Sequence, residues 1–201
     1  MFRSRAEEKV RKAGFDPARL PPGQSLTDKW PVLHAGGLPQ VDLESWTLRL
    51  FGEVEQEVTL DWKAFTALPH SSSVQDIHCV TRWSRFDMHF EGVHWRELAA
   101  LCRPLPSARF ALAWAEQEYS TNMPLGALED DDALFATHAE GSTLSLEHGY
   151  PLRLVVPNRY FWKSAKWLRA VELRSEDRPG FWERYGYNNE ADPWLEQRYS
   201  F

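Results

Sequence analysis

The chain is organised around Asp76-Ile77-His78-Cys79-Val80-Thr81-Arg82-Trp83-Ser84, which ends a predicted strand over residues 73–78 and continues into a charged, aromatic turn. Cys79 is one of two cysteines in the chain, and it lies beside His78 and three residues before Arg82. Nearby cations favour the thiolate form of a cysteine, which attacks electrophiles and ligates soft metals. A lone cysteine is also common as inert, buried filler. The stretch alone leaves both interpretations open.

Length and charge exclude several classes of protein. A chain of 201 residues is long enough for one good core. Its formal charge of −6 argues against a nucleic-acid-binding protein, which usually carries a basic face. Two cysteines do not suggest a disulfide scaffold. The charged N-terminus has no apolar signal segment and no run is long enough for a membrane span, so we expect a cytoplasmic protein.

Hydrophobic patterns predict many short strands and few helices. Strands are expected over residues 45–51, 73–78, 87–93, 109–115, 119–125, 134–137, 152–156 and 167–173. Helices are expected over residues 3–13, 60–68 and 93–101, with Thr59 as N-cap of the second and Pro69 as its stop. No βαβα rhythm or linker is visible. The sequence therefore predicts a single strand-rich α+β domain over residues 30–201, after an N-terminal arm over residues 1–29.

A strip of positive charge stands out in this acidic chain. Residues 149–171 contain no carboxylate and five cations, which are Arg153, Arg159, Lys163, Lys166 and Arg169. The rest of the chain therefore carries −11, since −6 minus +5 is −11. Such segregation is unfavourable unless an anion is bound, and guanidinium and ammonium groups both suit phosphate oxygens. A solvated basic face is the alternative, but interleaved aromatic residues favour a concave site for a flat anionic molecule.

Two long motifs, in this order, resemble the molybdopterin-binding domain of the sulfite oxidase family. The first is the Cys79 stretch. The second comprises the segments His148-Gly149-Tyr150-Pro151-Leu152-Arg153-Leu154-Val155-Val156-Pro157 and Tyr160-Phe161-Trp162-Lys163-Ser164-Ala165-Lys166-Trp167. The chain looks most similar to small stand-alone bacterial members related to the catalytic subunit of protein-methionine-sulfoxide reductase. Residues 30–34 and 180–183 also resemble that subgroup, so the likeness runs from about Trp30 to the C-terminus.

The resemblance implies the sulfite oxidase molybdopterin-binding fold and a molybdenum ion held by a pterin dithiolene. It implies that Cys79 is the protein ligand to the metal and that Arg153 holds the pterin phosphate. A segment of the family that binds the same cofactor is matched by Ser164, Ala165 and Lys166, and we expect Lys163 to join them. His34 and His148 stand where relatives have cofactor-contacting asparagines, which is a departure from the family pattern.

The substrate implied by the resemblance is a small molecule, with an unidentified redox partner protein exchanging electrons. Members that oxidise sulfite carry asparagine and paired arginines after the cysteine, whereas this chain has Val80-Thr81-Arg82-Trp83-Ser84. This departure argues against sulfite as the substrate, and the reaction that we expect is a two-electron oxygen-atom transfer on a small substrate such as a sulfur or nitrogen oxide. His78, Arg82 and Arg85 are candidates for drawing an oxyanion to the metal, and a salt bridge with Asp76 or Asp87 is the alternative role of the arginines.

Three other functions fit parts of the sequence. A zinc site is suggested by His70, His78, Cys79, His89 and His94, but they lack the paired short spacing of structural zinc ligands. A cysteine nucleophile would need a base, and His148 suits this role better than His78, because adjacent strand residues point to opposite faces. A carrier or storage protein for the molybdenum cofactor, without turnover, also remains open.

Overall fold

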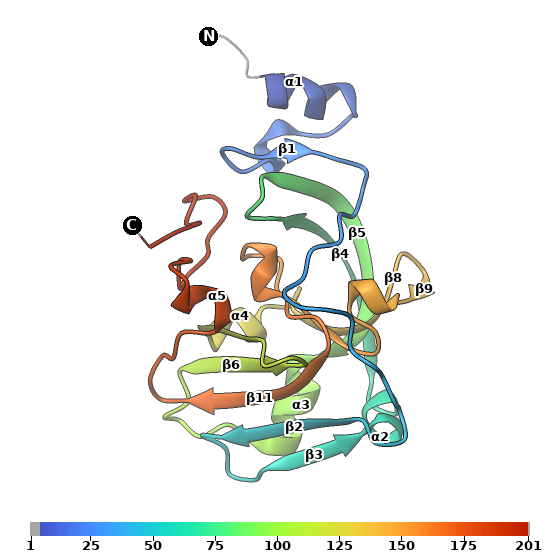
Figure 1. Ribbon diagram of the computed structural model, residues 1–201, viewed down its shortest axis with the longest axis vertical. Helices are drawn as coiled ribbons and strands as arrows, with labels where there is room; N and C mark the ends of the chain where they lie inside the picture. The colour runs from blue at the N-terminus through green and yellow to red at the C-terminus, as the bar shows by residue number, and fades with distance from the viewer. Residues whose placement is uncertain (1–4, 201) are drawn as a thin grey trace.

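Two β-sheets form the framework of the chain in the computed structural model, which describes residues 5–200 (Figure 1). The first sheet runs β1 (Ser25–Leu26), β5 (Trp83–His94), β8 (Leu134–Ala139) and β10 (Arg153–Val155), with β4 (His70–His78) paired to β5 and β9 (Ser142–Thr143) paired to β8. The second runs β3 (Val58–Asp61), β2 (Thr47–Gly52), β11 (Leu168–Arg174), β6 (Phe110–Ala115) and β7 (Ser120–Pro124). This architecture confirms the strand-rich α+β class.

The helices are short. They are α1 (Arg5–Lys12), α2 (Trp62–Thr66), α3 (Trp95–Cys102), α4 (Gly126–Glu129) and α5 (Phe181–Arg184), with 3-10 turns at Pro17–Arg19, Leu146–His148 and Phe161–Lys163. The prediction of helix over residues 60–68 is wrong at its start, because Val58–Asp61 pairs with β2 as a strand. Asp61, not Thr59, caps α2 by accepting from the backbone N–H of Ala64 at 2.7 Å. Residues 3 and 4 of the first predicted helix lie outside the described residues.

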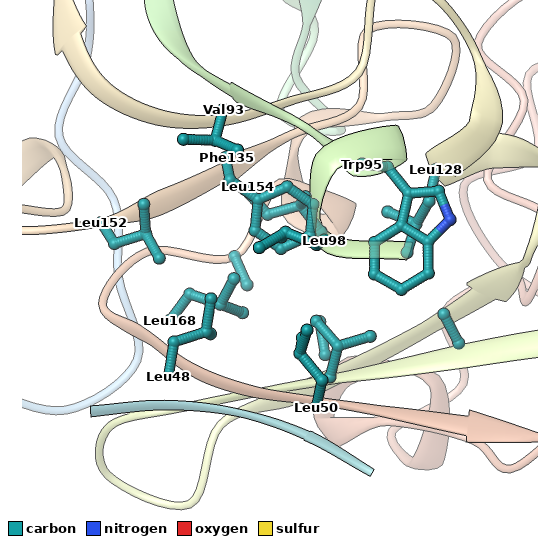
Figure 2. Packing of buried hydrophobic residues seen from close by; sticks show 14 of the residues in the cluster. Leu48, Leu50, Val93, Trp95, Leu98, Leu128, Phe135, Leu152, Leu154 and Leu168 are labelled. Carbon is teal, nitrogen blue, oxygen red and sulfur yellow. The ribbon is translucent and has the colours of Figure 1, made fainter. Parts of the chain in front are cut away.

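The main core lies where the two sheets face each other (Figure 2). Leu48 and Leu50 of β2 meet Phe135 of β8 and Leu154 of β10 there, and all four are almost fully buried. Alternating strand residues point to one face, which is why Leu48 and Leu50 enter the same core. Trp95 of α3 closes the layer and stacks on Phe135 with ring centroids 6.0 Å apart. The core holds the sheets rigidly against each other and so fixes the loops at their ends.

The two ends of the described chain pack on the first sheet and around its turn. The N-terminal segment forms a small cluster of Val10 and Leu26 with Phe86 of β5. The segment after α5 folds back on itself and forms an antiparallel bridge between Tyr187 and Tyr199. A domain boundary at residue 29 stays a prediction. Between residues 5 and 200, no helix combines the length and apolar character that crossing a bilayer requires.

Candidate functional site

Cys79 occupies the turn between the two long strands β4 and β5. The turn is closed by a hydrogen bond from Cys79 N to Trp83 O at 2.8 Å and another from Arg82 N to Cys79 O at 3.0 Å. Arg82 takes the left-handed backbone region, with φ of 73°, which lets the chain reverse within four residues. Cys79 is 8% exposed, and its thiol forms a hydrogen bond with the Thr81 hydroxyl at 3.1 Å. The hairpin thereby presents a single, nearly buried sulfur.

The electrostatics of this thiol differ from the sequence expectation. Burial raises the pKa of Cys79, while the hydrogen bond with Thr81 and the charge of Arg198 oppose that rise. The cation that acts on the sulfur thus comes from the C-terminal segment and not from its sequence neighbours. Without an added positive charge, such as a metal, the thiol form is favoured.

Arg153 is the most buried cation facing the site. Its side chain is 1% exposed, with Nη1 donating to His148 O at 2.8 Å and Nη2 donating to Ser164 O at 3.0 Å. Its Nε atom is buried without a hydrogen-bond partner, and the ion pairs of residues 5–200 do not include it. Burial lowers the pKa of Arg153. A buried guanidinium with an unused donor and no carboxylate is the arrangement expected around an anion.

Lys166, His148 and Gly149 lie around this arginine. Lys166 Nζ donates to Glu147 O at 2.7 Å, and burial together with the charge of Arg153 lowers its pKa to about 7. Burial, Arg153 and Lys166 lower the pKa of His148 to about 4, so its ring is neutral and stacks on Trp30 at 3.7 Å. Gly149 has φ of 113°, and a Cβ there would lie 2.9 Å from the Arg153 Cβ. Glycine therefore permits the close approach of these segments.

One cavity of about 370 Å³ joins the Cys79 turn to the Arg153 segment. Seven of the residues predicted from the sequence line it: His34, Cys79, His148, Arg153, Ser164, Ala165 and Lys166. These seven come from three segments far apart in the chain, and only the tertiary structure brings them together. Its remaining lining is mostly aromatic, with contributions from Trp30, Trp83, Tyr119, Phe161, Trp162, Trp167, Trp182 and Tyr187.

The wall nearest Cys79 is apolar. Val80, Trp182 and Tyr187 pack against the buried cluster that contains Trp162, and the Tyr187 ring lies 5.1 Å from both tryptophan rings. Burial raises the pKa of the Tyr187 phenol, and the Tyr199 and Cys79 side chains raise it further. Tyr187 therefore keeps its proton at neutral pH. The sequence analysis missed Tyr187 and Thr81, because a tyrosine in an aromatic tail and a threonine in a turn carry no motif of their own.

Three of the predicted residues do not line the cavity. His78 is buried beneath the hairpin, where its Nδ1 lies 2.8 Å from the Ser84 hydroxyl and its ring packs near Phe86 and Trp194. The Arg82 side chain turns toward Gly23. Lys163 is fully buried, with Nζ donating to Asn122 O at 2.7 Å and to Glu183 Oε1 at 2.6 Å.

The proposed salt bridges of the turn also have different partners. Asp76 pairs with Arg19 of the N-terminal segment at 2.6 Å, and the same arginine reaches Asp87 at 2.5 Å. Arg85 pairs with Glu140 at 2.6 Å. The sequence neighbours therefore do not pair with each other, because strand residues meet partners on adjacent elements and not along their own strand.

Zinc and a cysteine nucleophile find no support in this geometry. In residues 5–200, no group of three or more His, Cys, Asp or Glu side chains is placed to hold a metal ion. Among the same residues, the Cys79 thiol has a hydrogen bond with the Thr81 hydroxyl and none with a histidine. A cofactor that brings its own metal ligands needs only one protein sulfur, and the buried, unpaired Arg153 fits the phosphate of such a cofactor. The side chains present thus fit a molybdopterin bound across the cavity.

Comparisons with known proteins point in the same direction. Residues 35–182 match the family model of the oxidoreductase molybdopterin-binding domain. The chain is 41% identical over 184 residues to an uncharacterized oxidoreductase, YuiH, of Bacillus subtilis, a match covering 91% of this chain and 93% of that protein. It is 26% identical over 165 residues to the catalytic subunit MsrP of a protein-methionine-sulfoxide reductase of Campylobacter jejuni, covering 71% of this chain and 53% of that subunit.

A solved structure shares the fold. The sulfane dehydrogenase SoxCD from Paracoccus pantotrophus superimposes with a TM-score of 0.67 at 21% sequence identity. The match covers 76% of this chain and 43% of the dehydrogenase chain. At this identity, the likeness supports the architecture of the two sheets.

Proposed function

The chain belongs to the oxidoreductase molybdopterin-binding domain family and is a molybdopterin-dependent oxidoreductase of the sulfite oxidase type; from this premise, we propose that it transfers an oxygen atom, with two electrons, to or from a small neutral oxide of sulfur or nitrogen. The observation that carries the proposal is the shared cavity, in which a lone sulfur, Cys79, and a buried cation without a carboxylate, Arg153, lie on the same lining. These are the two kinds of group that a metal-bearing, phosphorylated pterin requires.

The proposed division of roles follows the two ends of the cofactor. Cys79 would ligate the molybdenum, and Arg153 and Lys166 would hold the phosphate, with His34, His148, Ser164 and Ala165 lining the space between. When bound, the molybdenum cofactor supplies the two-electron chemistry, while the protein supplies position, electrostatics and access. Arg153 is well suited to this role because two of its donors are already held by backbone carbonyls, which orients the guanidinium in advance.

The remaining predicted residues would act from behind the cavity. Lys163 would hold the Phe161–Lys163 turn in place through its bonds to Asn122 and Glu183, instead of contacting phosphate. His78 and Arg82 would support the hairpin. In place of His78 and Arg82, we assign the role near the reacting atoms to Tyr187 and Thr81, which line the cavity. A protonated phenol and a hydroxyl can orient an oxide or donate a proton to it.

The charge distribution supports a neutral substrate. The cations that line the cavity are Arg153 and Lys166, and both act on His148, whereas the wall beside Cys79 is made of Val80 and aromatic rings. Arg198, whose charge acts on the sulfur, does not line the cavity, so an anion beside Cys79 would meet an apolar lining without direct contact with a cation, which is unfavourable. A sulfoxide or an N-oxide has a polar oxygen and apolar substituents, which suit a hydroxyl-bearing aromatic wall. The Campylobacter relative is named for a sulfoxide of methionine.

The test combines cofactor analysis with turnover. Purified full-length protein should contain about one molybdenum per chain and release a fluorescent oxidised pterin on denaturation. With a reduced dye as electron donor, it should reduce a neutral sulfoxide or N-oxide, and with an oxidised dye as acceptor it should oxidise sulfite at least about tenfold less efficiently. Bound molybdenum that does not change oxidation state with any donor or acceptor, and passes readily to other proteins, would indicate a carrier instead.

A further inference from the structure

Two backbone carbonyls of the Cys79 turn are bound by side chains from opposite ends of the chain. Gln24 Nε2 donates to Cys79 O at 2.9 Å, and Arg198 Nη1 donates to Val80 O at 2.9 Å. Gln24 and Arg198 are 4% and 5% exposed, so these bonds are shielded from water. Both residues also lie outside residues 35–182, the part of the chain that matches the family model. The turn that carries the sulfur therefore depends on segments beyond the shared domain.

Arg198 links three segments at this point. Its Nη2 donates to Pro22 O at 3.3 Å in the N-terminal segment, and its guanidinium lies 4.8 Å above the Tyr160 ring. Its ion-pair partner, Glu196, is 3.6 Å away and half exposed, so the carboxylate compensates the buried charge only weakly. Burying an arginine mainly to bind two carbonyls is unfavourable compared with an apolar residue. Arg198 is therefore better explained by its hydrogen bond to the Cys79 turn than by its contribution to stability.

The turn needs external support. Its own backbone supplies the bonds Cys79 N to Trp83 O and Arg82 N to Cys79 O, and Arg82 holds a left-handed backbone that side chains other than glycine rarely adopt. Bonds from a buried amide and a guanidinium to the carbonyls of residues 79 and 80 restrict the two peptide groups that flank the sulfur-bearing residue. The space around them is filled, since a Cβ at Gly23 would collide with the Glu196 carboxylate.

We infer that Arg198 and Gln24 are positioning residues, which hold the Cys79–Val80 backbone in the orientation that the sulfur needs to ligate the metal, so that both ends of the chain complete the cofactor site. The inference rests on the role proposed above for Cys79. Neither residue lines the cavity, so each acts through the backbone of the turn and not by contact with the cofactor or substrate. Loss of either bond removes a restraint on the backbone of the turn.

The experiment uses the full-length protein as purified and compares Arg198→Met and Arg198→Lys with the control Arg174→Met. Arg174 is a matched control, because its Nε also donates to a backbone carbonyl, Glu176 O, at 3.2 Å at the far end of β11. Amide hydrogen exchange of residues 79–83, molybdenum retained during dialysis, kcat and KM are measured for each variant. Urea unfolding shows whether any change is local or global.

In Arg198→Met, we expect the amide hydrogens of residues 79–83 to exchange at least about tenfold faster than in the wild-type protein, because losing one charge-assisted hydrogen bond changes an equilibrium by about that factor. Exchange in β2 and β11 should stay unchanged. The variant should lose molybdenum faster and have a lower kcat with a KM within about twofold of the wild-type value. Arg198→Lys should restore part of the amide protection, the molybdenum retention and kcat, since an ammonium can still donate to Val80 O.

Amide exchange at residues 79–83 of Arg198→Met that equals the wild-type rate would overturn the inference. If the wild-type protein holds no molybdenum, the proposed function fails, and the exchange comparison still decides whether Arg198 holds the turn.

Discussion

Lys163 and Glu183 form an ion pair with no exposed side-chain surface, in which Nζ lies 2.6 Å from Oε1. Burial lowers the pKa of Lys163, and the carboxylate of Glu183 opposes that change. Glu183 Oε1 also accepts from Trp162 Nε1 at 2.9 Å and from the Thr121 hydroxyl at 3.1 Å. The pair therefore joins β7, the Phe161–Lys163 turn and α5 directly behind the cavity wall.

Removing one partner of this pair should strongly destabilise the fold. In Lys163→Met the carboxylate stays buried without its cation, and we expect the free energy of unfolding to fall by about 3–5 kcal/mol. Urea unfolding measures the loss. As the control, Arg49→Met breaks the half-exposed pair with Glu57 and should cost no more than about 1 kcal/mol. Equal losses in the two variants would contradict a supporting role for Lys163.

Replacing the sulfur ligand should separate catalysis from cofactor binding. Cys79→Ser should abolish turnover and leave pterin bound, because Arg153 and Lys166, the residues proposed to hold the phosphate, line the cavity from another segment of the chain. The measurements are turnover with a reduced dye and fluorescence of the released pterin. Cys102→Ala is the control, since Cys102 lies in the main core, and it should keep turnover while losing about 1–2 kcal/mol of stability. Full activity of Cys79→Ser would remove Cys79 from the metal.

Anion binding at the Arg153 end should depend on pH through Lys166. Its pKa, lowered to about 7, leaves it charged at pH 6 and mostly neutral at pH 8.5, so anion affinity should fall as pH rises across this range. Sulfate keeps its charge throughout and is a suitable probe for cofactor-free protein. We expect its dissociation constant to rise about three- to tenfold between the two values.

The matched variant for this pH effect is Lys166→Arg. An arginine stays charged at both pH values, so its sulfate affinity should change little between them. Calorimetry or competition with a fluorescent anion supplies the constants. A wild-type protein whose sulfate affinity is constant from pH 6 to 8.5 would show that Lys166 does not contribute its charge to the site.

The Tyr187 hydroxyl should matter for turnover more than for substrate affinity. Its phenol is protonated at neutral pH and lines the cavity near Cys79, so Tyr187→Phe removes a hydrogen-bond donor while keeping the ring against Trp162 and Trp182. We expect kcat to fall about tenfold or more, with a small change in KM. Tyr185→Phe, on a side chain that is 70% exposed, is the control. Unchanged kcat in Tyr187→Phe would place the hydroxyl outside the reaction.

Local sequence patterns predicted most strands, because alternating apolar residues pack one face of a sheet whatever the partner strand is. The error at α2 arose where two patterns overlapped: Leu60 has helical spacing with Ala64 and Leu68, yet the backbone of residues 58–61 pairs with β2. The pairing decided the outcome, since an edge strand gains a full ladder of hydrogen bonds from its neighbour. A propensity calculated for one segment cannot include that neighbour.

The sequence by itself determined the family, the cofactor class and seven of the residues that line the cavity, because these follow from residue types in motifs that resemble the family. Only the tertiary structure decided which charged side chains face the cavity and which are neutralised by a partner. Arg153 lines the cavity and keeps a buried donor without a partner, whereas Lys163, ten residues later, is neutralised by Glu183, and the cation that acts on Cys79 is Arg198. The physical reason is that a buried charge is defined by the partners packed around it, and those partners come from elements that are distant in the chain.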